Sequence, residues 1–264
     1  MRIIHLSDLH FGTESDMIVN ALTKALYDLS PDLVIVSGDF TQIGSSREFR
    51  LARDFLHSLS CDYLCVPGNH DVPARRLIER FSSPYKKYKK HIAEDLCPVY
   101  ENEQVVVAGL NSARRALPHW NWANGAISEP QRLKLKEIYT PGESRWTICT
   151  FHHPVHKVDE MPLDVTVFGR KRTLQTIRDL KVDLVLTGHV HHASITTVGD
   201  GEHQTVYLSA STALSSRIRG QENGFNVIDL DDEIMLIEIY KLLEQGDFES
   251  VQRFEIQKDL FHTR

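Results

Sequence analysis

The sequence of 264 residues has few of the features that mark secreted or membrane proteins. Its 4 cysteines form no C-x-x-C pair and are too few for a disulfide scaffold, which predicts a reducing compartment. No apolar run approaches the roughly 18 residues that a membrane span needs. Ser7 and Asp8 interrupt the N-terminal apolar run too early for a signal peptide. We therefore expect a cytoplasmic protein without a transmembrane segment.

Excess positive charge is also absent from the sequence. Lys and Arg total 30 against 36 Asp and Glu, so the formal net charge is -6. Proteins that bind nucleic acid through broad phosphate neutralisation are usually basic, so a nucleic-acid partner is not expected. The composition, with 41% apolar and 25% charged residues, is that of a globular protein. The length predicts a single domain over residues 1–264.

Apolar periodicity predicts alternating strands and helices over the first 190 residues. Strands are predicted at 3–6, 33–36, 63–66, 105–110, 146–151 and 184–186. Helices are predicted at 17–29, 49–59, 73–96, 131–138 and 173–180. After residue 193 only strands are predicted, at 194–198, 205–209, 225–230, 234–240 and 251–256. This order indicates an α/β fold of two sheets packed face to face with helices outside, the last strands completing the second sheet.

Histidine is abundant, with 14 residues, and several histidines stand beside Asp or Asn just after predicted strands. The five blocks are Asp8-Leu9-His10, Gly38-Asp39, Gly68-Asn69-His70-Asp71, His152-His153-Pro154 and Gly188-His189-Val190-His191. Ligands of α/β sheets bind outside the carboxyl ends of the strands, so these blocks should meet there. In the two pairs Asp8/His10 and His189/His191, a strand-like backbone would point both side chains the same way. The blocks therefore predict a shared metal site, whereas the alternative reading is a set of turn-forming residues.

The five blocks, in this order over residues 3–192, resemble the calcineurin-like metallophosphoesterase superfamily. The S-D-x-H, G-N-H-D and H-H-P patterns are most similar to its bacterial branch of class III cyclic-nucleotide phosphodiesterases and glycerophosphodiesterases. The resemblance implies a four-layer α-β-β-α sandwich of two mixed β-sheets flanked by helices. It also implies two metal ions, one held by Asp8, His10, Asp39 and His191 and the other by Asp39, Asn69, His152 and His189.

The expected chemistry follows from these ligands. Asp39 is the best candidate for the carboxylate that bridges the two ions. Carboxylate, amide and imidazole ligands without thiolate suit Mn, Fe, Zn or Co. A hydroxide that bridges two such ions can attack phosphorus in line with the leaving alkoxide. By the resemblance, His70 is a general acid or a phosphate-oxygen donor, and Asp71 orients its ring or, alternatively, caps a helix.

Other residues are candidates for substrate contact. Asn111 and Arg114 at the end of a predicted strand are similar to residues of the same branch, although a strand terminus and loop explain them equally. Trp120 and Trp122 could hold a quaternary ammonium or stack on a nucleobase, or else serve packing or oligomer contacts. His153 beside the ligand His152 has a supporting or substrate-contacting role. The lysines at 86–90 are a solvated helix face or a means of approaching an anionic surface.

These observations favour a phosphodiesterase for small phosphodiesters, namely glycerophosphodiesters or phospholipid-headgroup diesters such as choline and ethanolamine esters. The alternative is a cyclic-nucleotide (cAMP-type) phosphodiesterase. A nuclease is disfavoured by the acidic net charge and the short tail after the last block. A non-catalytic scaffold on this fold is disfavoured because no ligand is missing. A homo-oligomer is expected because the strand-rich tail could pair between subunits.

Overall fold

The computed structural model describes residues 1–74, 76–119, 121–140, 143–156, 165–199, 203–215 and 220–258. The chain begins with β1 (Arg2–Leu6), α1 (Asp16–Leu29), β2 (Leu33–Val36), α2 (Ser46–His57) and β3 (Asp62–Cys65). It continues with α3 (Leu77–Ser82), α4 (Lys86–His91), β4 (Val99–Glu101), β5 (Val105–Gly109), β6 (Gly125–Ala126) and α5 (Glu129–Ile138). Next come β7 (Trp146–Thr150), β8 (Val167–Phe168), α6 (Arg170–Asp179) and β9 (Leu184–Thr187). The last strands are β10 (Ser194–Gly199), β11 (Gln204–Ser209), β12 (Gly224–Leu230), β13 (Ile234–Leu242) and β14 (Phe248–Gln257).

Two large mixed sheets organise the fold. One has the strand order β14-β13-β12-β1-β2-β3, with β1, β2 and β3 parallel and β12, β13 and β14 antiparallel. The other has the order β10-β11-β9-β7-β5-β4, with parallel β11, β9, β7 and β5 between two antiparallel edges. The expectation that all the late strands complete one sheet is therefore wrong. Only β10 and β11 join the second sheet, whereas β12 pairs with β1 and extends the first.

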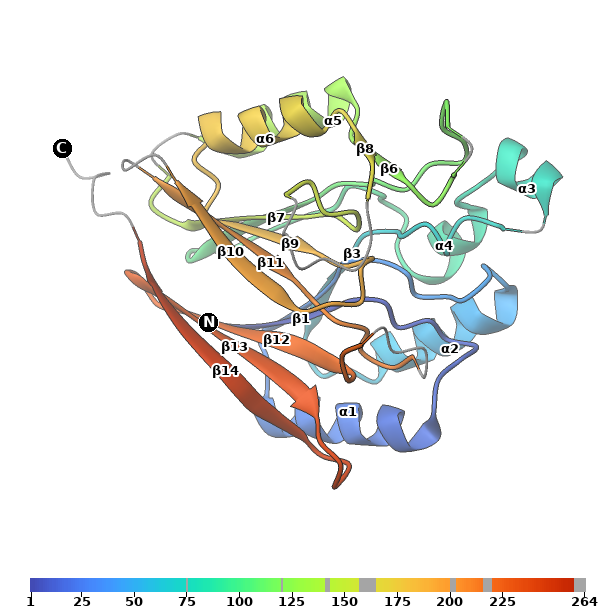
Figure 1. The fold of residues 1–264 in the computed structure, drawn as a ribbon, viewed down its shortest axis with the longest axis horizontal. Coiled ribbons are helices and arrows are strands. Elements are labelled where there is room, and N and C mark those ends of the chain that lie inside the picture. The colour runs from blue at the N-terminus through green and yellow to red at the C-terminus, as the bar shows by residue number, and fades with distance from the viewer. Residues whose placement is uncertain are drawn as a thin grey trace.

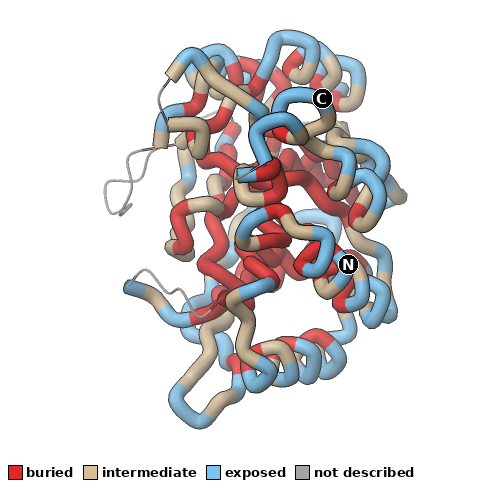
Figure 2. The backbone as a smooth tube through the Cα atoms, turned by 90° about the vertical axis from the view of Figure 1, so that its right-hand side faces the viewer, coloured by how far each residue is buried: buried red, intermediate tan, exposed pale blue. Residues whose placement is uncertain are grey.

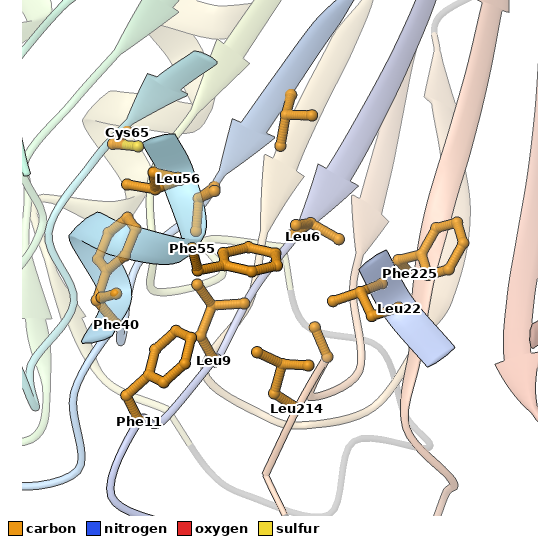
Figure 3. Packing of buried hydrophobic residues seen from close by; sticks show 14 of the residues in the cluster. Leu6, Leu9, Phe11, Leu22, Phe40, Phe55, Leu56, Cys65, Leu214 and Phe225 are labelled. Carbon is orange, nitrogen blue, oxygen red and sulfur yellow. The ribbon is translucent and has the colours of Figure 1, made fainter. Parts of the chain in front are cut away.

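The core has three apolar layers, and these confirm the four-layer sandwich. One layer packs α1 and α2 against the first sheet, where Leu6 and Leu9 point toward Leu22 and Phe55 (Figure 3). The second layer lies between the sheets and the third lies under α5 and α6. Figure 1 shows the two pairs of helices on opposite sides of the sheets, and Figure 2 shows buried residues concentrated between them. Both sheets are thus packed on two faces by apolar side chains.

Local chemistry explains where the observed helices differ from the predicted ones. The helix α2 begins three residues earlier than predicted because Ser45 and Glu48 form a reciprocal capping box. The single helix predicted over 73–96 is wrong: two short helices, α3 and α4, are separated by Ser83, Pro84 and Tyr85. Proline has no N–H to donate and disfavours helical backbone in the residue before it. Among the described residues, no helix is long and apolar enough to cross a membrane.

Candidate metal centre

The five sequence blocks follow five parallel strands that end at the same side of the sandwich. The blocks containing Asp8, Asp39 and Asn69 follow β1, β2 and β3 of the first sheet. Those containing His152 and His189 follow β7 and β9 of the second sheet. Two hydrogen bonds cross between the sheets at this point, from the His189 N–H to Asp8 Oδ2 at 2.9 Å and from His152 Nδ1 to the Ser37 carbonyl at 2.8 Å. The sheets are therefore joined where the blocks meet.

The backbone of the blocks is left-handed rather than strand-like. The φ angles are positive at five non-glycine residues: Asp8 (53°), His10 (47°), Asp39 (56°), His189 (71°) and His191 (55°). The expectation of strand-like alternation in the two x-apart pairs is therefore wrong, although their side chains do converge. Such backbone costs of order 1–3 kcal/mol per residue and persists only where the surroundings enforce it. Backbone hydrogen bonds between the loops after β1 and β2 help to do so, from Asp8 N to Gly38 O and from His10 N to Asp39 O, both at 3.0 Å.

Two glycines allow the blocks to approach closely. A Cβ atom at Gly188 would collide with the side chains of Ser7 and Asp8. A Cβ atom at Gly68 would collide with Asp39. Glycine is therefore required at both positions by close approach, as the sequence pattern predicts for the residue before each ligand.

The first group of predicted ligands contains Asp8, His10 and His191, all buried. Asp8 Oδ2 accepts hydrogen bonds from the Ser7 hydroxyl at 2.6 Å and from the His189 N–H. Asp8 Oδ1 is buried and has no hydrogen-bond partner among the described residues. It lies 3.1 Å from His191 Nε2 and 3.5 Å from His10 Nε2, and these two nitrogens are 3.0 Å apart. One carboxylate oxygen and two ring nitrogens thus face a common point.

The second group contains Asn69, His152 and His189. His152 Nε2 lies 3.2 Å from Asn69 Oδ1 and 3.3 Å from His189 Nδ1. Asn69 Oδ1 and His189 Nδ1 are 2.9 Å apart. Asp39 lies between the groups, because its Oδ2 is 3.2 Å from His152 Nε2 and 3.8 Å from His10 Nε2. Its other oxygen accepts the His70 N–H at 2.8 Å, which fixes the carboxylate in this orientation.

The donor set fits divalent metal ions. His152 Nδ1 faces the Ser37 carbonyl, so in the neutral ring it carries the proton and Nε2 presents a lone pair. The same nitrogen faces three polar atoms, namely Asp39 Oδ2, Asn69 Oδ1 and His189 Nδ1. A single proton on Nε2 would form a hydrogen bond with only one of them. Two ligands of one ion with bonds of about 2.1 Å are about 3.0 Å apart in octahedral and about 3.4 Å apart in tetrahedral coordination. The separations of 2.9–3.3 Å among Asn69, His152 and His189 are close to these values.

Electrostatics show how strongly the centre attracts positive charge. Burial alone would raise the pKa of Asp39, but the imidazoles of His152 and His70 outweigh it and hold that pKa well below its usual value. Asp8 behaves in the same way, because its pKa is lowered by His191 and His10 against the effect of burial. Burial alone would lower the pKa of His152, but the carboxylate of Asp39 raises it to about 9. Two buried carboxylates that are held ionised among imidazoles therefore favour positive charge at the centre.

His70 lies at the edge of this centre. Its ring is half-buried and meets the ring of His10 edge to face, with centroids 4.8 Å apart. His70 Nδ1 lies 2.7 Å from the Gln42 carbonyl, which leaves Nε2 as the nitrogen available for proton exchange. The expectation that Asp71 orients this ring is wrong, because the Gln42 carbonyl does so.

Asp71 instead joins two loops of the centre. Its carboxylate accepts hydrogen bonds from the Thr41 N–H, the Thr41 hydroxyl and the Gly68 N–H. Burial, with a contribution from the nearby Asp39 carboxylate, raises its pKa to about 7. The alternative role as a helix cap is also wrong, because α3 begins only at Leu77.

Three of the candidate substrate-contacting residues differ in whether their side chains have hydrogen-bond partners within the protein. His153 is buried, with Nδ1 2.8 Å from the Ser112 hydroxyl and Nε2 2.8 Å from the Ala123 carbonyl. The Arg114 guanidinium donates to the carbonyls of Asn111 and Ala113 and to Gln131. Asn111 is buried, and its Oδ1 has no hydrogen-bond partner among the described residues. Of these three, only Asn111 has a buried side-chain polar atom without a partner among the described residues.

The tryptophans differ in how far the structure describes them. Trp120 lies outside the described residues. Trp122 packs against α3, with the Arg80 guanidinium 5.3 Å from its ring centroid and the Phe81 ring edge-on to it at 5.7 Å. An ammonium group on this ring would therefore compete with Arg80, which agrees with the packing alternative for Trp122.

Several residues that support the centre were not predicted. Besides Ser7 and Thr41, Thr212 donates its hydroxyl proton to the Asp8 carbonyl at 2.6 Å. Thr212 lies far along the chain from Asp8, and no local pattern points to it. Ser7 had a signal, since a hydroxyl directly before a metal-binding carboxylate is placed to orient it.

His5 lies buried beneath the centre and makes stability depend on pH. Its Nδ1 lies 3.1 Å from Asn226 Nδ2, its Nε2 lies 2.9 Å from the Ser37 hydroxyl, and burial lowers its pKa to about 3. Between about pH 6.5 and pH 3 the unfolded chain binds a proton that the folded chain does not. The free energy of unfolding contributed by His5 is therefore fully present above pH 6.5 and is lost as the pH falls toward 3.

We expect His5→Gln to flatten this acid dependence by up to about 1.4 kcal/mol per pH unit, because glutamine does not titrate. Urea unfolding of the metal-free wild type and variant at pH 7, 6, 5 and 4 measures the two slopes. The variant should be less stable than wild type at pH 7 and closer to it at pH 4. Equal slopes for both chains would contradict the neutral, buried state of His5.

Comparisons with known proteins found a matching family profile and several named relatives. Residues 1–193 match the sequence profile of the family described as Calcineurin-like phosphoesterase. A probable glycerophosphodiester phosphodiesterase, GpdQ, of Arcobacter nitrofigilis is 28% identical over 210 residues, which cover 74% of this chain and 74% of that protein. A probable cyclic nucleotide phosphodiesterase of Synechococcus is 27% identical over 213 residues, covering 74% and 75% of the two chains.

A solved structure supports the fold. The crystal structure of a dimetal phosphatase from Danio rerio superposes with a TM-score of 0.71, covering 98% of this chain and 99% of that one. At 14% sequence identity the likeness concerns the fold alone.

Proposed function

The chain belongs to the calcineurin-like phosphoesterase family and is a metal-dependent phosphodiester hydrolase, and from this premise we propose that it hydrolyses glycerophosphodiesters or phospholipid-headgroup diesters at a centre of two divalent ions. The observation that carries the two-ion proposal is the position of Asp39 Oδ2 between His10 and His152. Asp8, His10 and His191 would hold one ion, and Asn69, His152 and His189 the other, with Asp39 shared. When bound, such ions neutralise charge on phosphoryl oxygens and acidify water.

The other functions of the proposed centre, positioning the ligands and supplying a proton, depend on residues of the chain itself. Asp8 and Asp39 are each fixed through one carboxylate oxygen, so that the other oxygen stays directed at the centre. The left-handed backbone and the loop hydrogen bonds hold these donors in place before any ligand arrives, which reduces the reorganisation that binding requires. His70 is held through Nδ1 by the Gln42 carbonyl, so its Nε2 can deliver a proton to a departing alkoxide.

The proposed cytoplasmic location has one supporting observation. Cys61, Cys65, Cys97 and Cys149 are all free thiols in the structure, as a reducing compartment requires.

The choice of ester rests on the named relatives. The relative from Arcobacter nitrofigilis bears the name of a glycerophosphodiester phosphodiesterase, and the match covers about three quarters of each chain. The second candidate is hydrolysis of a cyclic nucleotide, favoured by relatives named for that activity in Synechococcus and Mycobacterium tuberculosis. Both reactions place a phosphodiester with a poor alkoxide leaving group at the same centre, so the surrounding pocket decides between them.

A matched substrate panel tests the proposal. We expect kcat/KM of the Mn-loaded enzyme for glycerophosphocholine or glycerophosphoethanolamine to exceed that for 3′,5′-cyclic AMP and 2′,3′-cyclic AMP by at least roughly tenfold, about 1.4 kcal/mol in the barrier. Phosphatidylcholine in the same panel shows whether the enzyme hydrolyses headgroup diesters that are still attached to a lipid or only the free glycerophosphodiesters. The Asp39→Asn variant, purified in parallel, measures contaminating activity.

Opposite outcomes have clear meanings. Preference for a cyclic nucleotide would replace the first candidate by the second. Faster hydrolysis of p-nitrophenyl phosphate than of bis-p-nitrophenyl phosphate would contradict diesterase activity altogether.

A further inference from the structure

Positive charge is concentrated in a groove of about 1130 Å³ between α2 and the pair α3 and α4. We call it the basic groove; its basic lining consists of Arg50, Arg53, Arg76, Lys86, Lys87 and Lys90. Glu79 is the one carboxylate among its described lining residues. The chain as a whole has a formal net charge of -6, so this local excess of positive charge opposes the overall balance.

Half of these cations form no ion pair within the described parts of the chain. Glu79 pairs with Lys87 at 2.7 Å and with Arg76 at 3.5 Å, and Arg53 pairs with Asp54 at 2.6 Å. Arg50, Lys86 and Lys90 are exposed and form no ion pair with any part of the chain that the structure describes. The basic groove therefore presents three solvated charges that an anionic partner could neutralise.

Exposed apolar side chains lie beside these charges on α3. Leu77, Ile78 and Phe81 are 56%, 88% and 43% exposed. The helix is nevertheless firmly attached, because the buried Arg80 guanidinium donates to the carbonyls of Pro73, Arg114 and Arg115. Figure 1 shows α3 at the edge of the molecule. A fixed helix thus directs apolar groups into solvent next to a basic surface.

We propose that the basic groove and α3 form a docking surface for a phospholipid bilayer that contains anionic lipids. A cluster of four to eight lysines and arginines attracts anionic lipid surfaces, and exposed apolar side chains add insertion into the interface. Nucleic acid would bind the positive charges, but it would not account for the exposed apolar side chains of Leu77 and Ile78. If a second copy of the chain docked through the same surface, the two basic grooves would repel each other.

The position of this surface relates docking to the metal centre. Lys87 Nζ donates to the Gly44 carbonyl at 3.0 Å, in the same loop whose Gln42 carbonyl holds the His70 ring. On the other side, Phe81 contacts Trp122, which immediately precedes the Ala123 that binds His153. A bilayer against α3 and the basic groove would therefore contact elements that adjoin the segments holding His70 and His153. Docking itself needs no hydrolysis, so it can be tested independently of the proposed function.

Vesicle co-sedimentation of the metal-loaded full chain tests the proposal. We expect binding to vesicles of phosphatidylcholine with 30% phosphatidylglycerol, chosen as roughly a third anionic lipid, at least about tenfold tighter than to phosphatidylcholine alone. Arg50→Gln/Lys86→Gln/Lys90→Gln should weaken this binding by roughly 100-fold, since each cation near an anionic surface contributes a factor of about five. Ile78→Ser should weaken it by roughly tenfold through lost apolar burial.

A matched control distinguishes an effect of this surface on vesicle binding from an effect of the net charge of the protein. Lys136→Gln/Lys171→Gln/Arg172→Gln removes three exposed cations from α5 and α6, which cover the other sheet, and should leave vesicle binding unchanged. Thermal unfolding verifies that all variants are folded. Equal binding to neutral and anionic vesicles, equal loss in both triple variants, or no vesicle binding by wild type would each overturn the proposal. A fluorescent 20-nucleotide polyuridylate, with a length of roughly one single-strand binding site, tests for nucleic-acid binding. If this probe binds more tightly than the anionic vesicles, and only the first triple variant loses that binding, the proposal is also overturned.

Discussion

Replacement of Asp39 by alanine is expected to abolish phosphodiester hydrolysis, with kcat/KM falling by at least roughly 10³-fold, and to reduce the bound metal below two ions per chain. The physical reason is that Asp39 Oδ2 lies between the ring nitrogens of His10 and His152, at 3.8 Å and 3.2 Å. Without it, two cations would lie close together with one less negative charge between them, at a cost of several kcal/mol. Metal analysis by plasma mass spectrometry, together with turnover of bis-p-nitrophenyl phosphate, measures both effects.

Two further variants make this result specific. Asp39 has a φ angle of 56°, so alanine adds backbone strain that asparagine tolerates better. Asp39→Asn should therefore stay folded and still lose the second ion. Asp183→Asn removes a half-buried carboxylate directly before β9, one that accepts hydrogen bonds from Thr147 in β7, and should keep metal and activity. Two ions and full rate in Asp39→Asn would refute the shared-ligand assignment.

Replacement of His70 by alanine is expected to keep both metal ions but to lower kcat by roughly 10²–10⁴-fold for alkyl diesters, the usual contribution of general acid catalysis. His70 lies at the edge of the centre, with its Nδ1 engaged by the Gln42 carbonyl and its Nε2 available to a leaving group. A good leaving group such as p-nitrophenolate needs little protonation, so its loss should be smaller. Rates for glycerophosphocholine and bis-p-nitrophenyl phosphate give the comparison.

The exposed His57 on α2 provides the matched control, since His57→Ala removes an imidazole far from the ligands. It should match wild type in metal content and in both rates. An equal loss for both leaving groups in His70→Ala would argue against an acid and for a phosphate-oxygen contact. Loss of metal in His70→Ala would make His70 a ligand, which its closeness to His10 and Asp39 permits.

The composition of the centre was predictable because its residues form short, dense blocks. All seven predicted ligands, from Asp8 to His191, lie in the two groups that Asp39 joins. The strands and most helices were predictable for a similar reason, since apolar periodicity reports burial directly. The helix over 73–96 was mispredicted because the residue pattern there is typical of a helix, whereas the single Pro84 within it marks an interruption.

Interactions between distant segments could not be predicted in the same way. Asp71 follows His70 in sequence, yet its carboxylate bonds to Thr41 and Gly68, and the Gln42 carbonyl takes its expected place. Trp122 was a candidate for ligand binding, yet Arg80 and Phe81 from α3 cover its ring. In both cases the partner comes from a loop or helix that only packing brings near.

The sequence by itself determined which side chains carry the chemistry and at which strand ends they stand, because ligand type and strand pattern are both local properties. The tertiary structure decided how these side chains face each other: left-handed backbone at Asp8 and His10 replaces strand alternation, and pairing with β12 and β2 places β1 inside the first sheet. It also decided that the lysines of α4 lie beside α2 and the apolar face of α3. Such outcomes depend on contacts between residues far apart in the chain, for which a local pattern carries no information.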